Sequence, residues 1–454
     1  MFERQILDYL RRWALRENRK PLILRGARQV GKTTAVNMFS AEFDQYLYMN
    51  LEIGEDRNVF RQDLSFQEIV QALFFLKNKV RKRKKTLIFI DEIQNSPEAV
   101  RRLREFYEFA PELYVIAAGS LLETLISKQI HFPVGRVEFF YMYPLTFREF
   151  LQAMEEEAAL KTLNTIPFPQ FAHNRLLKLF YQYVLIGGMP EIVENYIKHQ
   201  DLVSLNPIYE ALLVSYLDDV EKYARGHASA HVIRRVIRSS FYEAGTRIRF
   251  EGFGQSRYRS REIGEALRTL EKTMLLRLIY PTTSVNTPIV PDLRKAPKLQ
   301  VLDTGLVNYF VGLQKEIFGT RELNAVYEGR IAEHIVGQEL IAQRESAIQE
   351  ISFWVRGKKQ SSAEVDFLAA HENLLIPVEV KSGKAGRLRS LFQFMEKAPH
   401  PYAVRIYSGP LQVDEIALIG AKPFLLLNLP FFLVGELNQY LGWLTAKYPE
   451  FKGP

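Results

Sequence analysis

Gly26-Ala27-Arg28-Gln29-Val30-Gly31-Lys32-Thr33 is the stretch that decides the fold, because it has the residue types and spacing of a phosphate-binding loop. The apolar segment before it, Pro21-Leu22-Ile23-Leu24, predicts a short buried strand, and the segment from Thr34 to Phe39 predicts the first turns of a helix. Strand, loop and helix in this order are the context that such a loop requires. The sequence therefore predicts a nucleoside triphosphate site at this point of the chain.

Each part of this loop has a role that follows from its chemistry. Glycines at both ends allow the backbone to turn tightly around a triphosphate, while backbone N–H groups and the helix N-terminus donate hydrogen bonds to it. Lys32 adds positive charge next to the phosphates, and Thr33 offers a hydroxyl ligand for Mg²⁺. We therefore expect ATP and Mg²⁺ as ligands, with nucleotide contacts from Gly26, Ala27, Arg28, Gln29, Val30, Gly31, Lys32, Thr33 and Thr34.

A second apolar segment, Thr86-Leu87-Ile88-Phe89-Ile90, predicts a central parallel strand that ends in Asp91 and Glu92. We expect Asp91 to hold Mg²⁺, directly or through water, and Glu92 to polarise the water that attacks the γ-phosphate. Two acids after a strand can also be an ordinary helix start. Downstream of a complete phosphate-binding loop, the catalytic interpretation is favoured.

Two further residues are candidates for sensing or stabilising the γ-phosphate. A strand predicted at Leu113–Ala118 is followed by Gly119 and Ser120, and Ser120 would contact the γ-phosphate or the attacking water. A serine at a strand end is also a common turn former or helix cap. Arg136 is the candidate for a charge-stabilising arginine, acting within the chain or from a neighbouring subunit, with a surface salt bridge as its alternative role.

Taken together, these motifs give the chain a family resemblance. It resembles the predicted AAA+-superfamily ATPases of bacteria and archaea that carry a C-terminal region of restriction-endonuclease-like, PD-(D/E)xK character. Besides the loop and the acid pair, the resemblance rests on Ala118-Gly119-Ser120, Tyr143–Phe150, Gly187–Glu191, Leu302–Leu306, Glu364–Phe367 and Pro377–Lys381. These motifs span nearly the whole chain. The resemblance implies an ATPase fold and site, but it does not define a cellular role.

Composition limits the class of protein. The chain has 454 residues, of which 47% are hydrophobic and 25% charged, as is ordinary for a globular protein of two to four domains. It contains no cysteine, which excludes disulfides, thiolate zinc sites and cysteine nucleophiles. The charged N-terminus lacks the apolar core of a signal peptide, and the apolar tract Phe424–Gly435 is too short to cross a bilayer. We expect a cytoplasmic protein without membrane partners.

The net charge of +8 is unevenly distributed. Between His231 and Leu270 there are nine arginines and four glutamates, a surplus of five that accounts for more than half of the excess. Clustered arginines neutralise nucleic-acid phosphates. Within this patch, Ser260–Leu270 predicts an amphipathic helix. A predicted strand at Leu275–Tyr280 and a turn at Pro281–Thr283 follow it, and together the three elements suggest a winged helix. Such a module would bind DNA, or it would serve as a hinge or subunit contact.

The C-terminal third predicts a second candidate site. Glu364–Leu368 and Leu375–Lys381 each predict a strand, and the period of two places Glu379 and Lys381 on one face. If Asp366 lies on the adjacent strand with the same orientation, an acid–acid–lysine cluster forms. Asp366 and Glu379 would then hold a second Mg²⁺ at a scissile phosphate, and Lys381 would activate water, as in PD-(D/E)xK nucleases.

Glu333, on the predicted helix at residues 330–336, resembles the helix-borne acid that often joins this nuclease site. Two alternatives stay open. A half-exposed sheet also shows alternating charges, and this fold is often reused for binding after catalysis has been lost.

The fold class that follows is α/β. Residues 1–155 would form an AAA+-like parallel-sheet ATPase domain, 156–312 a helical and winged-helix region, and 313–454 a nuclease-like domain. AAA+-like modules commonly place the nucleotide between subunits, so a homo-oligomer is a further expectation.

Three functions are compatible with these elements. The leading hypothesis is an ATP-driven machine that acts on DNA. The second is a nucleotide-dependent switch or scaffold whose nuclease-like domain only binds a partner. The third, a small-molecule kinase, is disfavoured because the Asp91-Glu92 pair suits attack by water better than transfer to an alcohol.

Overall fold

Two structural units make up the chain in the computed structural model, which describes residues 2–81, 84–119, 132, 133, 135–224, 226–313, 329–344, 351–357, 363–381, 388–417, 422–449 and 451. The first unit contains Met1–Pro144 together with Lys272–Leu275. The second contains Leu145–Glu271 and Leu276–Pro454, and so includes most of the predicted middle region and the predicted C-terminal domain. The division into 1–155, 156–312 and 313–454 stays a prediction.

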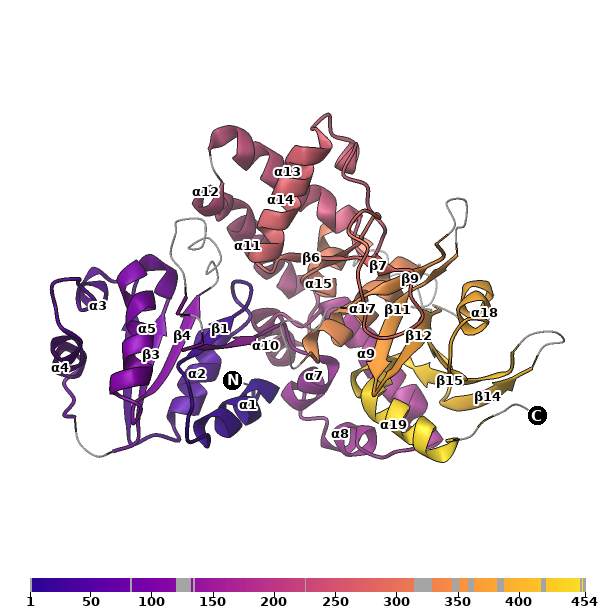
Figure 1. Ribbon diagram of the computed structural model, residues 1–454, viewed down its shortest axis with the longest axis horizontal. Helices are drawn as coiled ribbons and strands as arrows, with labels where there is room; N and C mark the ends of the chain where they lie inside the picture. The colour runs from indigo at the N-terminus through magenta and orange to yellow at the C-terminus, as the bar shows by residue number, and fades with distance from the viewer. Residues whose placement is uncertain are drawn as a thin grey trace. The chain divides into compact units, whose positions relative to one another are not determined.

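The sheet of the first unit has five strands in the order β2-β3-β4-β1-β5, and every neighbouring pair is parallel. Figure 1 shows β1, β3 and β4 side by side within this unit. The three strands that the sequence predicts here are confirmed, each with small differences at its ends. The bounds are β1 Leu22–Arg25, β2 Gln45–Asn50, β3 Thr86–Asp91, β4 Tyr114–Gly119 and β5 Glu138–Tyr141.

Helices cover both faces of this sheet. Ile88 and Ile90 of β3 pack into a core with Leu73 and Leu103, which come from two helices on one face. Alternate residues of the same strand point to the other face and are fully buried as well, as expected for a parallel sheet covered on both sides. The helices are α1 Gln5–Ala14, α2 Lys32–Ser40, α3 Gly54–Asn58, α4 Phe66–Leu76 and α5 Pro97–Phe109.

The rest of the chain begins with a helical region. Its helix α7 starts at a capping box, in which the Thr146 hydroxyl accepts from the Glu149 N–H and the Glu149 carboxylate accepts from the Thr146 N–H. The predicted helix at 260–270 is present as α14. The helices are α7 Phe147–Ala153, α8 Glu157–Leu163, α9 His173–Ile186, α10 Pro190–His199, α11 Asn206–Asp218, α12 Val220–Tyr223, α13 His227–Tyr242, α14 Ser260–Lys272, α15 Thr304–Phe310, α17 Gly329–Ala342, α18 Arg389–Met395 and α19 Leu437–Lys447.

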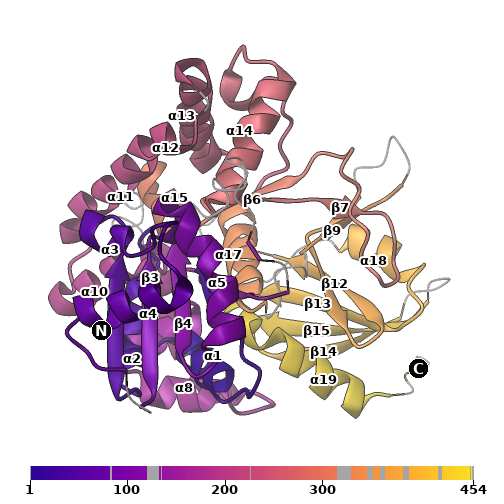
Figure 2. The same cartoon turned by 60° about the vertical axis from the view of Figure 1, so that its left-hand side comes forward.

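Three sheets complete the second unit. A five-stranded mixed sheet has the order β11-β12-β13-β15-β14, a three-stranded sheet the order β10-β9-β7, and β6 pairs with β8. Figure 2 shows β12, β13, β15 and β14 side by side. The bounds are β6 Leu276–Ile279, β7 Pro281–Thr282, β8 Lys298–Val301, β9 Phe353–Val355, β10 Glu364–Val365, β11 Phe367–His371, β12 Leu374–Val380, β13 Tyr402–Tyr407, β14 Gln412–Ile416 and β15 Phe424–Pro430.

Two sequence-based strand and turn assignments are wrong. The single strand expected at Glu364–Leu368 is interrupted at Asp366, so that β10 joins one sheet and β11 another. The turn expected at Pro281–Thr283 begins instead with strand β7, which pairs with β9 at the edge of the three-stranded sheet. Proline is tolerated there because it is the first residue of an edge strand. The winged-helix assignment itself stays a prediction.

The apolar tract Phe424–Gly435 is part of the core, as the sequence predicts. It forms β15 and the start of the short 3-10 helix η6 Phe431–Glu436, and nearly all of it is buried. None of the helices that the structure describes is long and apolar enough to cross a membrane.

Glycines of two motifs, Gly187–Glu191 and Leu302–Leu306, lie very close to backbone atoms of other segments. A Cβ on Gly188 would lie 2.2 Å from the Leu145 carbonyl oxygen, and a Cβ on Gly305 would lie 2.0 Å from the Ile186 carbonyl oxygen. The Gly188 N–H donates to Asp303 Oδ2 at 2.6 Å. Glycine at these positions therefore allows α9, α10 and α15 to pack closely.

Glu339 lies at the centre of this packing. It is a fully buried side chain of α17, and its Oε1 atom accepts both the Tyr183 hydroxyl (2.7 Å) and the Phe147 N–H (3.0 Å). Burial raises the pKa of Glu339 to about 7. The carboxyl is therefore neutral in acid and is ionised, at a cost in stability, in mild base.

Replacing Glu339 by glutamine is expected to stabilise the protein selectively at high pH. The folded-state pKa lies above the ordinary value of a carboxyl group, so the wild type loses stability as the pH rises from about 5 to about 8. Glutamine keeps one oxygen for both donors and cannot ionise. We expect E339Q to exceed the wild type by about 3 kcal/mol near pH 8 and by little near pH 5 in urea unfolding. E415Q, at an exposed position, is the control, and a pH-independent difference for E339Q would contradict this account.

Candidate functional site

The phosphate-binding loop joins β1 to α2 at the carboxyl edge of the parallel sheet. Its turn places Gln29 (φ 64°) and Gly31 (φ 93°) in the left-handed region. The Lys32 ammonium is buried within the loop, where Nζ donates to the carbonyl oxygens of Gly26 and Ala27, both at 2.9 Å. Burial lowers the pKa of Lys32 to about 8. A triphosphate beside this ammonium would oppose the shift, because an anion favours the charged form.

Contacts from outside the loop fix its shape. A Cβ on Gly26 would lie 2.6 Å from the Met142 carbonyl oxygen, so only glycine fits this close approach. The Arg4 guanidinium donates from Nη1 to the Val30 carbonyl oxygen at 3.1 Å and from Nη2 to that of Tyr143 at 2.8 Å. Sequence reasoning missed Arg4, because a charged residue near the N-terminus gives no signal that it is buried.

Thr33 and Asp91 meet at this edge of the sheet, as the sequence predicts. The Thr33 hydroxyl donates to Asp91 Oδ2 at 2.7 Å, and the Tyr48 hydroxyl donates to the same oxygen at 3.3 Å. Hydroxyl and carboxylate oxygens are ligands that Mg²⁺ prefers, so the pair fits the expected ion. Tyr48 was not foreseen, although the alternation of Tyr46 and Tyr48 on β2 was a signal that one face of this strand is polar.

Glu92 follows directly and has an unusual backbone. Its φ of 52° and ψ of 42° lie in the left-handed region, which is uncommon for a residue other than glycine and often marks a functional site. The Gln94 amide donates to Glu92 Oε2. Burial raises the pKa of the Glu92 carboxyl, which makes its ionised form a better proton acceptor.

The γ-phosphate contact expected for Ser120 stays a prediction, because Ser120 lies outside the described residues. The residue before it, Gly119, ends β4 and is aligned with Arg25, the last residue of β1. The end of β4 therefore lies at the same edge as the start of the phosphate-binding loop.

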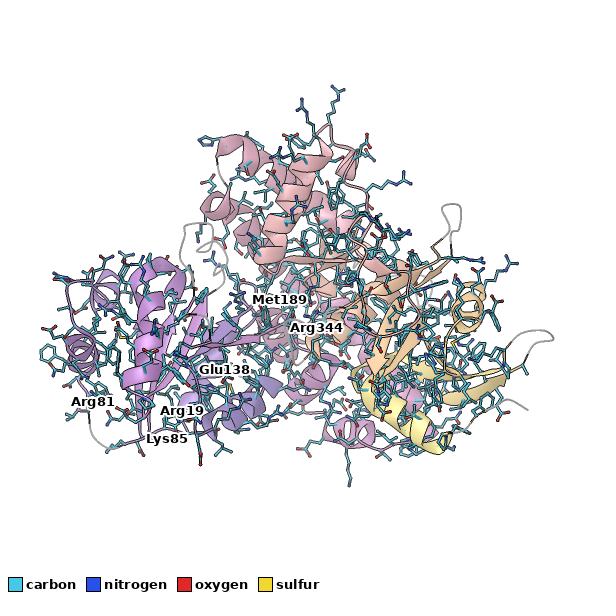
Figure 3. All side chains as sticks on the ribbon, viewed as in Figure 1. Arg19, Arg81, Lys85, Glu138, Met189 and Arg344 are labelled. Atoms are coloured by element: carbon cyan, nitrogen blue, oxygen red, sulfur yellow. The ribbon has the colours of Figure 1, made fainter. Side chains whose placement is uncertain are left out.

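Arg136 lies at the opposite edge. It precedes β5, whose first residue, Glu138, is aligned with the first residue of β1, so the whole of β1, about 13 Å, separates Arg136 from the loop. Arg19, Lys85 and Glu138 mark this amino edge in Figure 3. Arg136 Nε donates to Glu108 Oε1 at 2.9 Å. Arg136 therefore lies away from the loop of its own chain, and its role as a charge-stabilising arginine stays a prediction.

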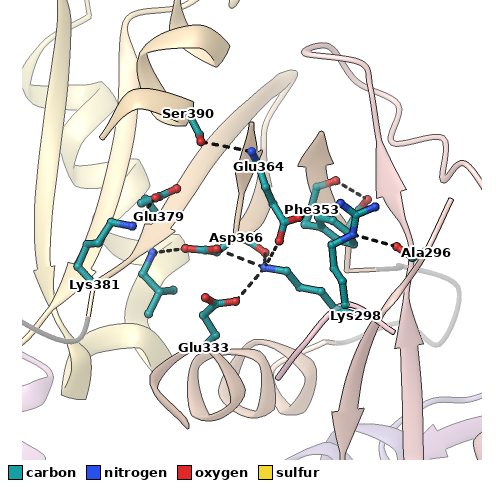
Figure 4. Close-up of polar contacts among 12 residues, drawn as sticks. Ala296, Lys298, Glu333, Phe353, Glu364, Asp366, Glu379, Lys381 and Ser390 are labelled. Atoms are coloured by element: carbon teal, nitrogen blue, oxygen red, sulfur yellow. Dashed lines mark hydrogen bonds and ion pairs between the residues drawn. The ribbon is translucent and has the colours of Figure 1, made fainter. Parts of the chain in front are cut away.

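A second set of charged side chains gathers around the ammonium of Lys298 in the second unit (Figure 4). Lys298 Nζ lies 2.9 Å from Glu333 Oε2, 2.9 Å from Glu364 Oε1 and 3.2 Å from Asp366 Oδ1. The lysine comes from β8, whereas the acids come from α17, β10 and the bend after β10. Lys298 is only 4% exposed.

Asp366 and Glu379 lie side by side, as the sequence predicts. Phe367 is aligned with Val378 across β11 and β12, and the Asp366 carboxylate accepts the Val380 N–H at 2.8 Å. Lys381 Nζ donates to Glu379 Oε1 at 2.6 Å. The predicted acid–acid–lysine arrangement is present.

The electrostatics of this cluster do not favour a magnesium ion. Burial lowers the pKa of Lys298, but the carboxylates of Asp366, Glu333 and Glu364 raise it more, so its pKa stands above the ordinary lysine value. Burial, with help from Asp366, raises the pKa of Glu333 and of Glu379 to about 7. Within the described part of the chain, no three acidic, histidine or cysteine side chains are arranged to hold a metal. The Mg²⁺ site expected at Asp366 and Glu379 stays a prediction, and Asp366 already has the Lys298 ammonium as its partner.

Lys298 and Glu364 are the members of this cluster that sequence reasoning missed. Lys298 begins a short strand whose other residues are also buried, and this position was the available signal. A lysine at a strand start usually points to solvent, so only the tertiary contacts identify it.

The predicted basic patch lies on α13, α14 and the segment between them. Eight of its nine arginines are exposed. Three of the nine, Arg234, Arg247 and Arg261, form ion pairs with Glu221, Glu364 and Glu265, respectively. Among the residues that the structure describes, the following have no ion-pair partner within 4 Å: Arg235, Arg238, Arg249, Arg257, Arg259 and Arg268.

A family match to known proteins agrees with the fold of the first unit. Residues 18–151 match a family model described as an AAA domain. Together with the parallel sheet and the loop, this match decides the type of domain. The chain contains a P-loop ATPase domain of the AAA type. Residues 177–317 and 328–419 match two models described as domains of unknown function (DUF8612 and DUF4143).

Individual relatives are distant. An uncharacterized protein of Haemophilus influenzae is 21% identical over 373 residues, which are 79% of this chain and 81% of that protein. Among solved structures, the Walker-type ATPase paby2304 of Pyrococcus abyssi is 15% identical with a TM-score of 0.44, covering 68% of this chain and 96% of that one. The RuvB Holliday junction branch migration motor of Thermotoga maritima is 12% identical with a TM-score of 0.27, covering 61% and 89%.

Substitution of Gly26 by alanine is expected to weaken nucleotide binding by about tenfold or more. The added Cβ would collide with a backbone oxygen that cannot move without displacing the strand end, so the loop would lose its shape. Gly54→Ala is the matched control, because a Cβ at Gly54 meets nothing within 4 Å. Titration with a fluorescent ATP analogue checks both variants, and equal affinity for the two would contradict the proposed contact.

Proposed function

We propose that this chain is an ATP hydrolase that binds Mg-ATP at the carboxyl edge of the first unit's sheet. The observation that carries the proposal is the contact between the Thr33 hydroxyl and the Asp91 carboxylate, with Glu92 next in the chain. Three groups of the kinds required for metal binding and for water activation thus come from the loop after β1 and from the end of β3, on the other side of β4 in the same sheet.

The loop residues would bind the triphosphate. Backbone N–H groups of residues 26–34 donate to its oxygens, and Lys32 exchanges its contacts with the loop carbonyls for contacts with the β- and γ-phosphates. Magnesium, held by Thr33 and Asp91, would neutralise phosphate charge when it is bound. Arg4 and Tyr48 keep the loop and Asp91 in place.

Glu92 would orient and deprotonate the attacking water. Its side chain is half-buried, and its contact with Gln94 leaves the Oε1 atom for a water molecule. Ser120, in the segment after β4, is proposed to sense the γ-phosphate. Arg136 is proposed to act only on the nucleotide of a neighbouring subunit, which requires a homo-oligomer.

Lys32→Ala and Glu92→Gln are expected to separate binding from turnover. Lys32→Ala removes the positive charge next to the phosphates and would abolish both ATP binding and hydrolysis. Glu92→Gln would keep ATP affinity and slow hydrolysis by about 100-fold or more. Phosphate release and nucleotide titration measure the two steps. Lys85→Ala, at the amino edge of the sheet, is the control that should behave as the wild type. Normal turnover of both site variants would refute the proposed site.

We also propose that the second unit contacts DNA through the arginines of α13, α14 and the segment between them. The support is the set of exposed arginines that have no ion-pair partner among the described residues. Such side chains can neutralise phosphates without first breaking a salt bridge. Lys298 is paired with two acids of the predicted nuclease-like site, Glu333 and Asp366. We therefore favour DNA binding without DNA cleavage by this unit.

Removal of three of these arginines is expected to weaken DNA binding and any stimulation of ATP hydrolysis by DNA. We expect the combined variant R249A/R257A/R259A to lower affinity about tenfold or more and to reduce the slope of log K against log salt by about one per lost contact. Arg61→Ala and Arg294→Ala, at exposed arginines with intramolecular partners, are the matched controls. If the protein binds neither single- nor double-stranded DNA and neither changes the rate of ATP hydrolysis, the switch or scaffold function is favoured instead.

A further inference from the structure

We propose that Tyr48 is a positioning residue of the ATP site: its hydroxyl holds the Asp91 carboxylate in one orientation, and so sets the affinity for the metal ion without changing the affinity for the nucleotide alone. This inference rests on the proposed function, because it concerns the same site. It adds to that site a residue from β2, a strand that contributes nothing to the phosphate-binding loop or to the acid pair.

The first observation is the set of donors around the carboxylate. Asp91 is only 4% exposed. Its Oδ2 atom accepts from the Thr33 hydroxyl at 2.7 Å and from the Tyr48 hydroxyl at 3.3 Å, and its Oδ1 atom accepts from the Glu92 N–H at 3.0 Å. A carboxylate offers about four acceptor positions, so these three contacts leave about one for a metal ion or a metal-bound water. The orientation of the carboxylate therefore decides where this position points.

Tyr48 differs from the other two donors in its origin. Thr33 is itself an expected ligand of the metal, and Glu92 is the next residue in the chain. Tyr48 belongs to β2, which pairs with β3 in parallel so that Asn50 is aligned with Asp91. Its hydroxyl thus approaches from a neighbouring strand and contacts a metal ligand without being one. Such outer contacts orient the ligand and contribute to metal affinity.

The second observation is that the Tyr48 ring is fixed by other rings. It stacks with the Phe89 ring, with 5.6 Å between centroids and 29° between planes, and with the Tyr46 ring, with 6.3 Å and 28°. The hydroxyl is therefore presented from a side chain with little freedom to turn away. Its distance of 3.3 Å from Asp91 is long for a hydrogen bond between two oxygens, so the effect of its loss should be smaller than that of losing a ligand.

The chain offers a matched control in Tyr46. Tyr46 precedes Tyr48 by two residues, so the two side chains lie on the same face of β2, and both are half-buried. The Tyr46 hydroxyl, however, donates to Asn37 Oδ1 at 2.6 Å, on the exposed side of α2. The two tyrosines thus share residue type, strand and face, and the contact with Asp91 distinguishes them.

The test compares Tyr48→Phe, Tyr46→Phe and Asp91→Asn with the wild type, each as the full chain. Phenylalanine removes only the hydroxyl and keeps the ring contacts, so both tyrosine variants are expected to fold, which thermal unfolding checks. Manganese is the metal probe, and electron paramagnetic resonance measures its affinity in the presence of a saturating non-hydrolysable ATP analogue. Titration with a fluorescent ATP analogue in EDTA measures nucleotide affinity without metal.

We expect Tyr48→Phe to weaken manganese binding by about fivefold to tenfold, at or below the lower end of the range for outer contacts of metal ligands. Its nucleotide affinity in EDTA should equal that of the wild type, because the hydroxyl contacts the acid and not the loop. Tyr46→Phe should match the wild type in both measurements. Asp91→Asn should lose most of the manganese affinity.

The variants distinguish failure of this inference from failure of the proposed function. Wild-type manganese affinity in Tyr48→Phe, with loss in Asp91→Asn, would overturn the role of Tyr48 and leave the proposed site intact. Unchanged manganese affinity in Asp91→Asn would overturn both. An equal loss of manganese affinity in Tyr46→Phe, or weaker nucleotide binding of Tyr48→Phe in EDTA, would indicate general loosening of the sheet and would also overturn the role of Tyr48.

Discussion

A buried ammonium surrounded by carboxylates is the interaction on which the second unit depends. Lys298 connects β8 to α17 and to the segment of β10 and Asp366, so three segments that are separate in sequence meet at one charge. Loss of one member of a buried ion group leaves an uncompensated charge and costs about 3–5 kcal/mol. Asp366 lies at the break between β10 and β11, where its carboxylate accepts from both Lys298 and the Val380 N–H.

A constraint of a different kind organises the first unit. In a parallel sheet all carboxyl ends lie at one edge, so groups that are distant in sequence are brought together without any specific attraction between them. The order β2-β3-β4-β1-β5 places β4 between the strand of the loop and the strand of Asp91. The ends of three adjacent strands therefore form the proposed ATP site, and the same rule places Arg136 at the far edge.

Short-range sequence patterns predicted the features that depend only on residues near one another in the chain. The loop from Gly26 to Thr33, the strand ending in Asp91 and the pairing of Asp366 with Glu379 each follow from spacing and from a period of two, and the structure has all three. Arg4 and Lys298 could not be predicted, because their burial results from contacts with segments far away in sequence. The same limit explains why the partner of Asp366 was missed: the Lys298 ammonium comes from β8, which is distant in sequence.

The two buried lysines show how a binding site differs from a structural ion cluster. Lys32 and Lys298 are 8% and 4% exposed, yet their pKa values shift in opposite directions. Lys32 donates to neutral carbonyl oxygens, so burial dominates and the site gains most from an arriving anion. Lys298 has its anions within the fold, so an incoming phosphate would have to displace carboxylates and gains little. The residue type is the same and the burial is similar in the two cases, so the charge of the nearest acceptors decides which lysine is available to a ligand.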